Sequence, residues 1–224
     1  MQKPVLIYCY DAYCGWCYGF SPVIKKIAEE YNEILDTEVL SGGMILPEKP
    51  VHISASAGYI LKAYPSVEEL TGIRFGSDYL WHINHPDDSD WYPNSEKPAI
   101  AMCIFKEFYP ERAVEFAFDL QHALHFEGRD LTDDEAYRHL LEKYSIQPEI
   151  FYEKLASEAY KEMAYYEFSL MKQLQVTGYP CVFIQTAELK FVMVARGFTA
   201  YEELKDRIGK VLEDQDPNKK SRIG

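Results

Sequence analysis

The segment CGWC at residues 14–17 separates two stretches with different hydrophobic patterns, and this junction constrains the fold most. Before it, residues 5–10 are continuously apolar, which is typical of a short strand covered on both faces. After it, apolar residues recur at helical spacing as far as Tyr31, with charged residues opposite them. The pattern predicts a strand that leads into a helix beginning near Cys14, with a kink expected at Pro22.

The order of the other elements indicates an α/β chain with a large insertion. A second strand is predicted from Thr37, two antiparallel strands are predicted around a turn at residues 187–188, and a closing helix is predicted at residues 201–212. Without the mostly helical block between them, this is the order of the thioredoxin fold. We expect the fold to comprise residues 1–46 and 166–214, the all-helical insertion residues 47–165, and a polar tail residues 215–224.

Within the block, a loop rich in Pro, Asp and Ser at residues 84–98 precedes an apolar stretch at residues 99–109, which is expected to form a central helix. Ser95 is expected to cap that helix. Residues 132–135 have the spacing of a capping box, in which Thr132 would start a helix that reaches Tyr144.

The position of the cysteine pair indicates redox chemistry more than the Cys-x-x-Cys spacing does, since zinc sites share that spacing. At a helix N-terminus, free N–H groups and the helix dipole favour the thiolate form of Cys14, which is the nucleophilic form. Cys17 lies one turn later and could attack a mixed disulfide from within. The other three cysteines are interpreted as core residues: Cys9, Cys103 and Cys181.

Two further positions are candidates for the site. Pro180 begins a strand, where a cis peptide bond after Tyr179 would place Tyr179 backbone groups beside Cys14, free to pair with an extended substrate. A trans Pro180 that only starts the strand is the alternative. Asp11 could relay a proton to Cys17, although a turn residue at the end of the strand is the favoured interpretation.

Together, the strand, the CGWC segment, the following helix YGFSPVIKKIAEEY, the helical insertion and the late VTGYPCVFI resemble the DsbA-like branch of the thioredoxin superfamily. More narrowly, they resemble its FrnE-type predicted protein-disulfide isomerases. The resemblance implies thiol–disulfide exchange with protein or low-molecular-weight thiols, without a cofactor or a metal. It assigns Cys14 as nucleophile, Cys17 as resolving cysteine and Pro180 as the cis-proline. Tyr179, Pro180 and Trp16 are the expected substrate-binding residues.

Charge and hydropathy bear on partners and location. The sequence has 36 acidic and 23 basic residues, a formal charge of -13, which disfavours nucleic acid and anionic membranes as partners. No apolar run approaches the length of about 18 residues that predicts a membrane span. The N-terminus lacks the features of a signal peptide, so the expected location is cytoplasmic.

Other functions stay open at this point. One is a glutathione-dependent isomerase or transferase of the kappa-class type. Another is a non-enzymatic adaptor that senses redox state or binds zinc, with His82 and His85 as further ligands. The loop before the central helix supplies weaker candidates for substrate contact, for which packing or capping is the favoured role: Trp91, Tyr92 and Ser95. The sequence leaves reductase, oxidase and isomerase roles equally open.

Overall fold

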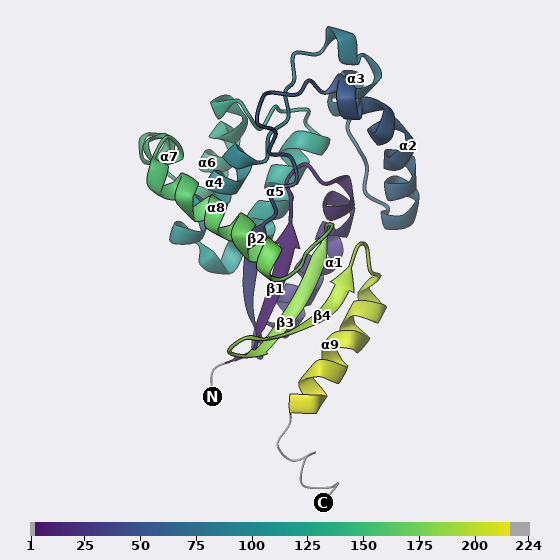
Figure 1. The fold of residues 1–224 in the computed structure, drawn as a ribbon, viewed down its shortest axis with the longest axis vertical. Coiled ribbons are helices and arrows are strands. Elements are labelled where there is room, and N and C mark those ends of the chain that lie inside the picture. The colour runs from purple at the N-terminus through teal and green to yellow at the C-terminus, as the bar shows by residue number, and fades with distance from the viewer. Residues whose placement is uncertain (1–2, 216–224) are drawn as a thin grey trace, which may run out of the picture.

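Four strands form one mixed sheet in the computed structural model, which describes residues 3–215 (Figure 1). The strand order is β2-β1-β3-β4, in which β1 is parallel to β2 and antiparallel to β3, and β3 is antiparallel to β4. The order confirms the expected α/β thioredoxin fold. The bounds of the strands are β1 (Val5–Tyr10), β2 (Asp36–Ser41), β3 (Cys181–Ala187) and β4 (Lys190–Arg196).

Helices make up most of the remaining chain, as the sequence predicts. Short 3₁₀ turns at Pro86–Asp88, Pro110–Arg112 and Asp134–Tyr137 connect some of them. Within residues 3–215, each helix is too short or too polar to cross a lipid bilayer. The helices are α1 (Gly15–Tyr31), α2 (Ser54–Thr71), α3 (Ser77–Asn84), α4 (Glu96–Phe108), α5 (Ala113–His125), α6 (Arg138–Tyr144), α7 (Pro148–Leu155), α8 (Glu158–Gln173) and α9 (Tyr201–Gln215).

The two faces of the sheet are covered by different helices. Alternate side chains of β1 point to opposite faces. Tyr8 lies on the face covered by α1 and packs against Phe20, with 6.0 Å between ring centroids. Cys9 lies on the other face, in a cluster that contains Met171 of α8. In Figure 1, α8 crosses the sheet and α9 lies beside β4. Because both faces are covered, β1 is apolar without alternation.

Close helix packing brings the insertion to the beginning of α1. Gly19 of α1 lies against α2, and a Cβ atom at Gly19 would be 2.8 Å from side-chain carbons of Val67 and Thr71. The missing side chain therefore lets α2 approach the turn of α1 that carries the cysteine pair. α1 continues through Pro22 without a break in its assignment.

One local expectation is resolved differently by the structure. The capping box at residues 132–135 is wrong: the side chain of Asp133 accepts the N–H of Glu135, whereas Thr132 donates its hydroxyl to Asp130. Asp133 caps the turn instead of Thr132 because it stands directly before the 3₁₀ turn.

The division into domains stays a prediction. The expected boundary between residues 165 and 166 falls inside α8, which is one continuous helix. Of the expected polar tail, Gln215 ends α9, and residues 216–224 lie outside the described part of the chain.

Candidate active site

Cys14 occupies the N-cap position of α1. Its backbone is extended, with φ −83° and ψ 107°, and its Sγ accepts the N–H of Cys17 at a distance of 3.4 Å. The backbone N–H of Cys14 donates to the carbonyl of Asp11, which closes the loop between β1 and α1. Its exposed fraction is 7 %. Cys14 therefore begins the helix, as predicted.

Cys17 lies one turn further into α1 and is fully buried. Burial raises the pKa of its thiol, and the hydrogen bond and charge of Cys14 raise this pKa further. Both residues are free thiols in the structure. The pair therefore consists of one largely buried sulfur at the N-terminal end of the helix and one fully buried sulfur one turn behind it.

The loop before β3 places a backbone carbonyl beside the first sulfur. The Tyr179–Pro180 peptide bond is cis, as predicted, and the Cys14 thiol donates to the carbonyl oxygen of Tyr179 at 3.6 Å. The phenol of Tyr179 donates to the carbonyl of Gly42 at 2.8 Å. A Cβ atom at Gly42 would lie 2.3 Å from the Tyr179 ring, so only glycine fits there.

Asp11 joins the cysteine loop to the loop after β2 and to the loop before α4. One carboxylate oxygen accepts the N–H of Tyr13 and the hydroxyl of Ser95, both at 3.0 Å, and the other accepts the N–H of Met44 at 2.7 Å. The bond to Tyr13 confirms the turn interpretation. Burial raises the pKa of Asp11, although these hydrogen bonds oppose the shift.

Ser95 does not cap α4, so that expectation is wrong. Its hydroxyl accepts the N–H of Ile45 at 3.0 Å while it donates to Asp11. The side chain of Asn94 accepts the first N–H of α4, that of Glu96, at 2.8 Å. The cap residue therefore stands one position earlier, which leaves Ser95 free to hold the loops around the cysteine pair.

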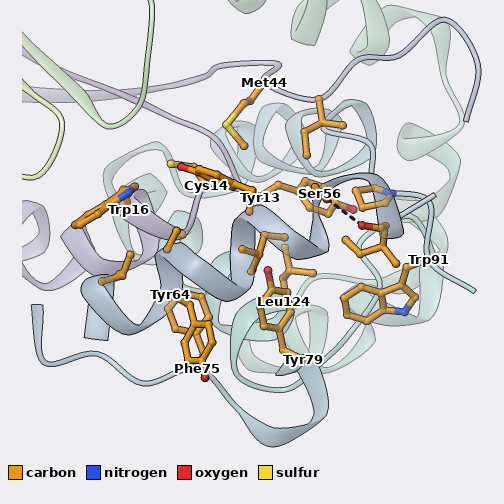
Figure 2. A pocket seen from close by; sticks show the side chains of 18 residues that line it. Tyr13, Cys14, Trp16, Met44, Ser56, Tyr64, Phe75, Tyr79, Trp91 and Leu124 are labelled. Carbon is orange, nitrogen blue, oxygen red and sulfur yellow. Dashed lines mark hydrogen bonds between the residues drawn. The ribbon is translucent and has the colours of Figure 1, made fainter. Parts of the chain in front are cut away.

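A cavity of about 160 Å³ opens beside Cys14, between the start of α1 and α2 (Figure 2). Trp16 lines it, and so does Trp91, one of the weaker candidates from the sequence. Tyr64 and Phe75 belong to an aromatic wall, with 5.8 Å between their ring centroids. None of the 18 lining residues, all within the described chain, is charged or a histidine. The cavity is therefore an apolar site next to the thiol of Cys14.

A profile of the family described as "DSBA-like thioredoxin domain" matches residues 5–209. The chain belongs to this family. Solved structures with the same fold include a proposed protein disulfide isomerase from Nitrosomonas europaea, with 22% identity and a TM-score of 0.85, covering 96% of this chain and 100% of that chain. None of the curated proteins compared with the sequence matches it.

Two further solved structures share the fold of this DSBA-like chain. The cytosolic disulfide reductase DsbM from Pseudomonas aeruginosa is 22% identical, with a TM-score of 0.72, covering 93% of this chain and 98% of that chain. A 2-hydroxychromene-2-carboxylate isomerase is 13% identical, with a TM-score of 0.64, covering 94% and 97%. At these identities the likeness shows a shared fold.

The DSBA-like fold does not assemble the zinc site considered from the sequence. His82 stacks on Trp91 and its ring nitrogen contacts the hydroxyl of Ser89, while His85 stacks on Trp81. Within residues 3–215, no group of three or more His, Cys, Asp or Glu side chains is arranged to hold a metal ion. The other three cysteines, expected in the core, are all buried: Cys9, Cys103 and Cys181.

Several site residues of this DSBA-like chain have no counterpart in the sequence-based predictions. Gly42 stands at the end of the second predicted strand, and Met44 and the α2 residues of the cavity come from segments that sequence patterns describe only as loop or helix. The two consecutive glycines after β2 are the one signal that could have identified Gly42. Of the other weak candidates, Tyr92 is exposed and packs on His52, so it does not line the cavity.

Proposed function

We propose that this chain is a thiol–disulfide oxidoreductase that works through Cys14 and Cys17. The observation that carries the proposal is the arrangement around Cys14: its sulfur accepts a helix N–H, contacts the carbonyl oxygen of Tyr179 and opens on a cavity. An N–H that points at the sulfur stabilises a thiolate. The nearby backbone of Tyr179 is suited to an extended peptide substrate.

In the reducing direction, the thiolate of Cys14 attacks one sulfur of a substrate disulfide. A bond forms between Cys14 and that sulfur, and the second substrate sulfur leaves and takes up a proton. Cys17 then loses its proton and attacks Cys14. This forms the Cys14–Cys17 disulfide and releases the first substrate sulfur as a thiol. Two electrons pass from the protein to the substrate, and a low-molecular-weight thiol is needed to restore the pair.

The proposed roles of the two cysteines agree with their different burial. An attacking sulfur must be reached from outside, whereas a resolving sulfur needs to reach only its neighbour. Trp16, Tyr179 and Pro180 are the proposed substrate-binding residues, because Trp16 lines the cavity beside Cys14 and the cis Tyr179–Pro180 bond lies where the Tyr179 carbonyl contacts the Cys14 sulfur. Glutathione is a reasonable restoring thiol, since DsbM, which shares this fold, has been solved with GSH. DsbM is described as cytosolic, and we propose the cytoplasm for this chain as well.

Reduction of insulin disulfides in the presence of dithiothreitol tests the proposal. Catalysis is expected to fall to the uncatalysed rate in Cys14→Ser. Cys17→Ser is expected to accumulate a mixed disulfide on Cys14, visible by mass spectrometry. The matched control is Cys103→Ala, because the sulfur of Cys103 lies among residues of α4 and α8. This variant should retain activity. Full activity of Cys14→Ser would refute the proposed function.

Equilibration of the pair with glutathione buffers assigns the direction of the reaction. A Cys14–Cys17 potential near that of the cytosolic glutathione pool supports a reductase, and a much higher one supports an oxidase or isomerase. A glutathione-dependent transferase has less support, because both cysteines of the pair are present and the cavity lining offers no charged group for the carboxylates of glutathione.

A further inference from the structure

The cavity beside Cys14 is a site of defined size and polarity. Its volume of about 160 Å³ is close to that of engineered apolar cavities, about 150 Å³, which bind one benzene molecule. It can therefore accept one aromatic ring or an alkyl group of similar size. Figure 2 shows Cys14 and Met44 on one side of this space and the aromatic side chains of Tyr64, Phe75 and Tyr79 on the other.

The lining favours an uncharged ring over a polar group. The rings of Phe75 and Tyr79 lie 5.7 Å apart, and the ring of Tyr79 lies 6.2 Å from that of Trp91. Aromatic groups gain from edge-to-face and offset contacts at such distances. A carboxylate or ammonium group would lose its hydration there without meeting an opposite charge, because the 18 lining residues of the described chain carry none.

Contact between the cavity and the cysteine links binding to reaction. Cys14 is itself part of the lining, together with its neighbours Gly15 and Trp16. A group held in the cavity is therefore only a few bonds from a sulfur that reacts with Cys14. The carbonyl of Tyr179, on which an extended peptide would pair, is not part of this lining.

We propose that the substrate of Cys14 carries an uncharged apolar group, the size of one aromatic ring, a short linker away from its reacting sulfur, and that the cavity binds this group. The inference rests on the proposed function and names its substrate class. The sulfur that bonds to Cys14 carries the ring, which stays in the cavity in the mixed disulfide. The other substrate sulfur leaves as a thiol, and Cys17 later releases the ring-bearing thiol as the Cys14–Cys17 disulfide forms.

Four disulfides test the inference on the reduced wild-type protein. Three of them have a two-carbon linker between the sulfur and the end group, and the fourth is built on cysteine. They are bis(2-phenylethyl), bis(2-hydroxyethyl) and bis(2-aminoethyl) disulfide, and glutathione disulfide. Each rate is divided by the rate of the same disulfide with free dithiothreitol, which removes differences in intrinsic reactivity. The phenylethyl compound is expected to react at least about tenfold faster than the others after this correction, from burial of one ring.

Filling the cavity is expected to remove the preference. Ala63 of α2 lines the cavity, and Ala63→Phe places a ring in the space that the substrate would use. Ala55→Phe adds the same ring to an exposed position of the same helix and is the matched control. We expect the normalised preference to fall towards one in Ala63→Phe and to persist in Ala55→Phe. Should Ala63→Phe fail to fold, competition by 2-phenylethanol on the wild-type protein provides the same test.

A second arm identifies the source of the ring. Peptides with Phe or Ser next to a disulfide-bonded cysteine are compared in the same way. A preference for the phenylethyl disulfide assigns a low-molecular-weight substrate, and a preference confined to the Phe peptide assigns a protein substrate. Equal normalised rates in both arms, or faster reaction of the aminoethyl compound or glutathione disulfide, would overturn the inference. Reaction with none of the compounds would instead overturn the proposed function.

Discussion

Two buried carboxylates lie in different surroundings in this chain. Glu167 of α8 accepts from the ammonium group of Lys106 at 2.5 Å and from the N–H of Ser41 at 2.7 Å, and so joins α8, α4 and β2. Asp11, between β1 and α1, accepts from backbone N–H groups and the hydroxyl of Ser95. None of the ion pairs found in residues 3–215 includes Asp11. The charge of Glu167 is balanced by the ammonium group of Lys106, whereas Asp11 has only hydrogen bonds from uncharged N–H and O–H groups.

The region around Glu167 is held together by an ion pair, whereas the region around Asp11 and Cys17 contains buried groups without an opposite charge. Burial lowers the pKa of Lys106, but the charges of Glu167 and Glu38 outweigh this and raise it overall, so Lys106 keeps its positive charge. Burial raises the pKa of Asp11 instead, and the charge of Asp11 contributes to the raised pKa of Cys17. Burial of a carboxyl group without an opposite charge therefore occurs beside the cysteine pair, where the proposed chemistry moves protons.

The largest effect is expected from removing the charge of Glu167. Glu167→Gln removes the buried negative charge beside Lys106 and leaves Glu38 as its charged partner. The substitution should lower the free energy of unfolding by on the order of 3 kcal/mol. Glu38→Gln is the matched control: Glu38 also contacts Lys106, at 2.7 Å, but its side chain is 46 % exposed against 7 % for Glu167. It should cost less than about 1 kcal/mol. Equal losses in urea denaturation would show that burial does not separate the two pairs.

An intermediate, pH-dependent effect is expected at His125, which lies behind the cavity wall with its ring 5.0 Å from that of Tyr79. Burial lowers the pKa of His125 to about 3. A lowered pKa contributes stability that is present above the unfolded pKa of about 6.5 and is lost as the pH falls towards the folded pKa. The wild-type protein should therefore lose about 2 kcal/mol through His125 between pH 7 and pH 5.

His125→Phe should lack that part of the pH dependence, whatever its stability at pH 7. His85→Phe, at an exposed position, is the control and should follow the wild-type curve. Unfolding by urea at pH 5, 6 and 7 measures the difference. Parallel curves for wild type and His125→Phe would mean that His125 accepts a proton in the folded protein as readily as in the unfolded one.

The parts of the structure that could be predicted from the sequence are those set by local patterns. The strand, the cysteine pair and the helix that follows are local patterns, and the position of Pro180 at a strand start is local too. The predicted site residues Cys14, Cys17 and Tyr179 therefore come together as expected. Residues 132–135 show the limit of such patterns, because a neighbouring acidic residue satisfied the cap instead.

The long-range part of the site could not be predicted in this way. Ser95 and Asp11 are 84 residues apart in sequence, and the hydroxyl of Ser95 has a capping role available next to it in the chain. Only the path of the insertion decides between the two. The cavity has the same origin, since Tyr64 and Phe75 are ordinary core aromatics until α2 packs beside the start of α1.

The smallest effect is expected from Ser95→Ala, and it tests whether dipoles hold the Asp11 carboxylate. The change removes a donor to Asp11 and should cost about 1 kcal/mol at pH 7. The raised pKa of Asp11 means that its native state keeps a proton to higher pH than the unfolded state, so the stability that this proton contributes is lost as the pH rises from about 4 through the folded pKa. Without the Ser95 donor the carboxylate is harder to ionise, which raises that pKa further and makes the cost of the substitution grow with pH.

Urea denaturation of Ser95→Ala at pH 4, 5.5 and 7 should accordingly give a loss that is smallest at pH 4. Ser66→Ala, on the exposed side of α2, serves as the control and should show a small change without pH dependence. A loss of the same size at every pH would mean that the hydroxyl matters only through the N–H of Ile45 that it accepts. In that case the contrast between Asp11 and Glu167 would lie in packing, and the region around the cysteine pair would owe nothing to the charge of its carboxylate.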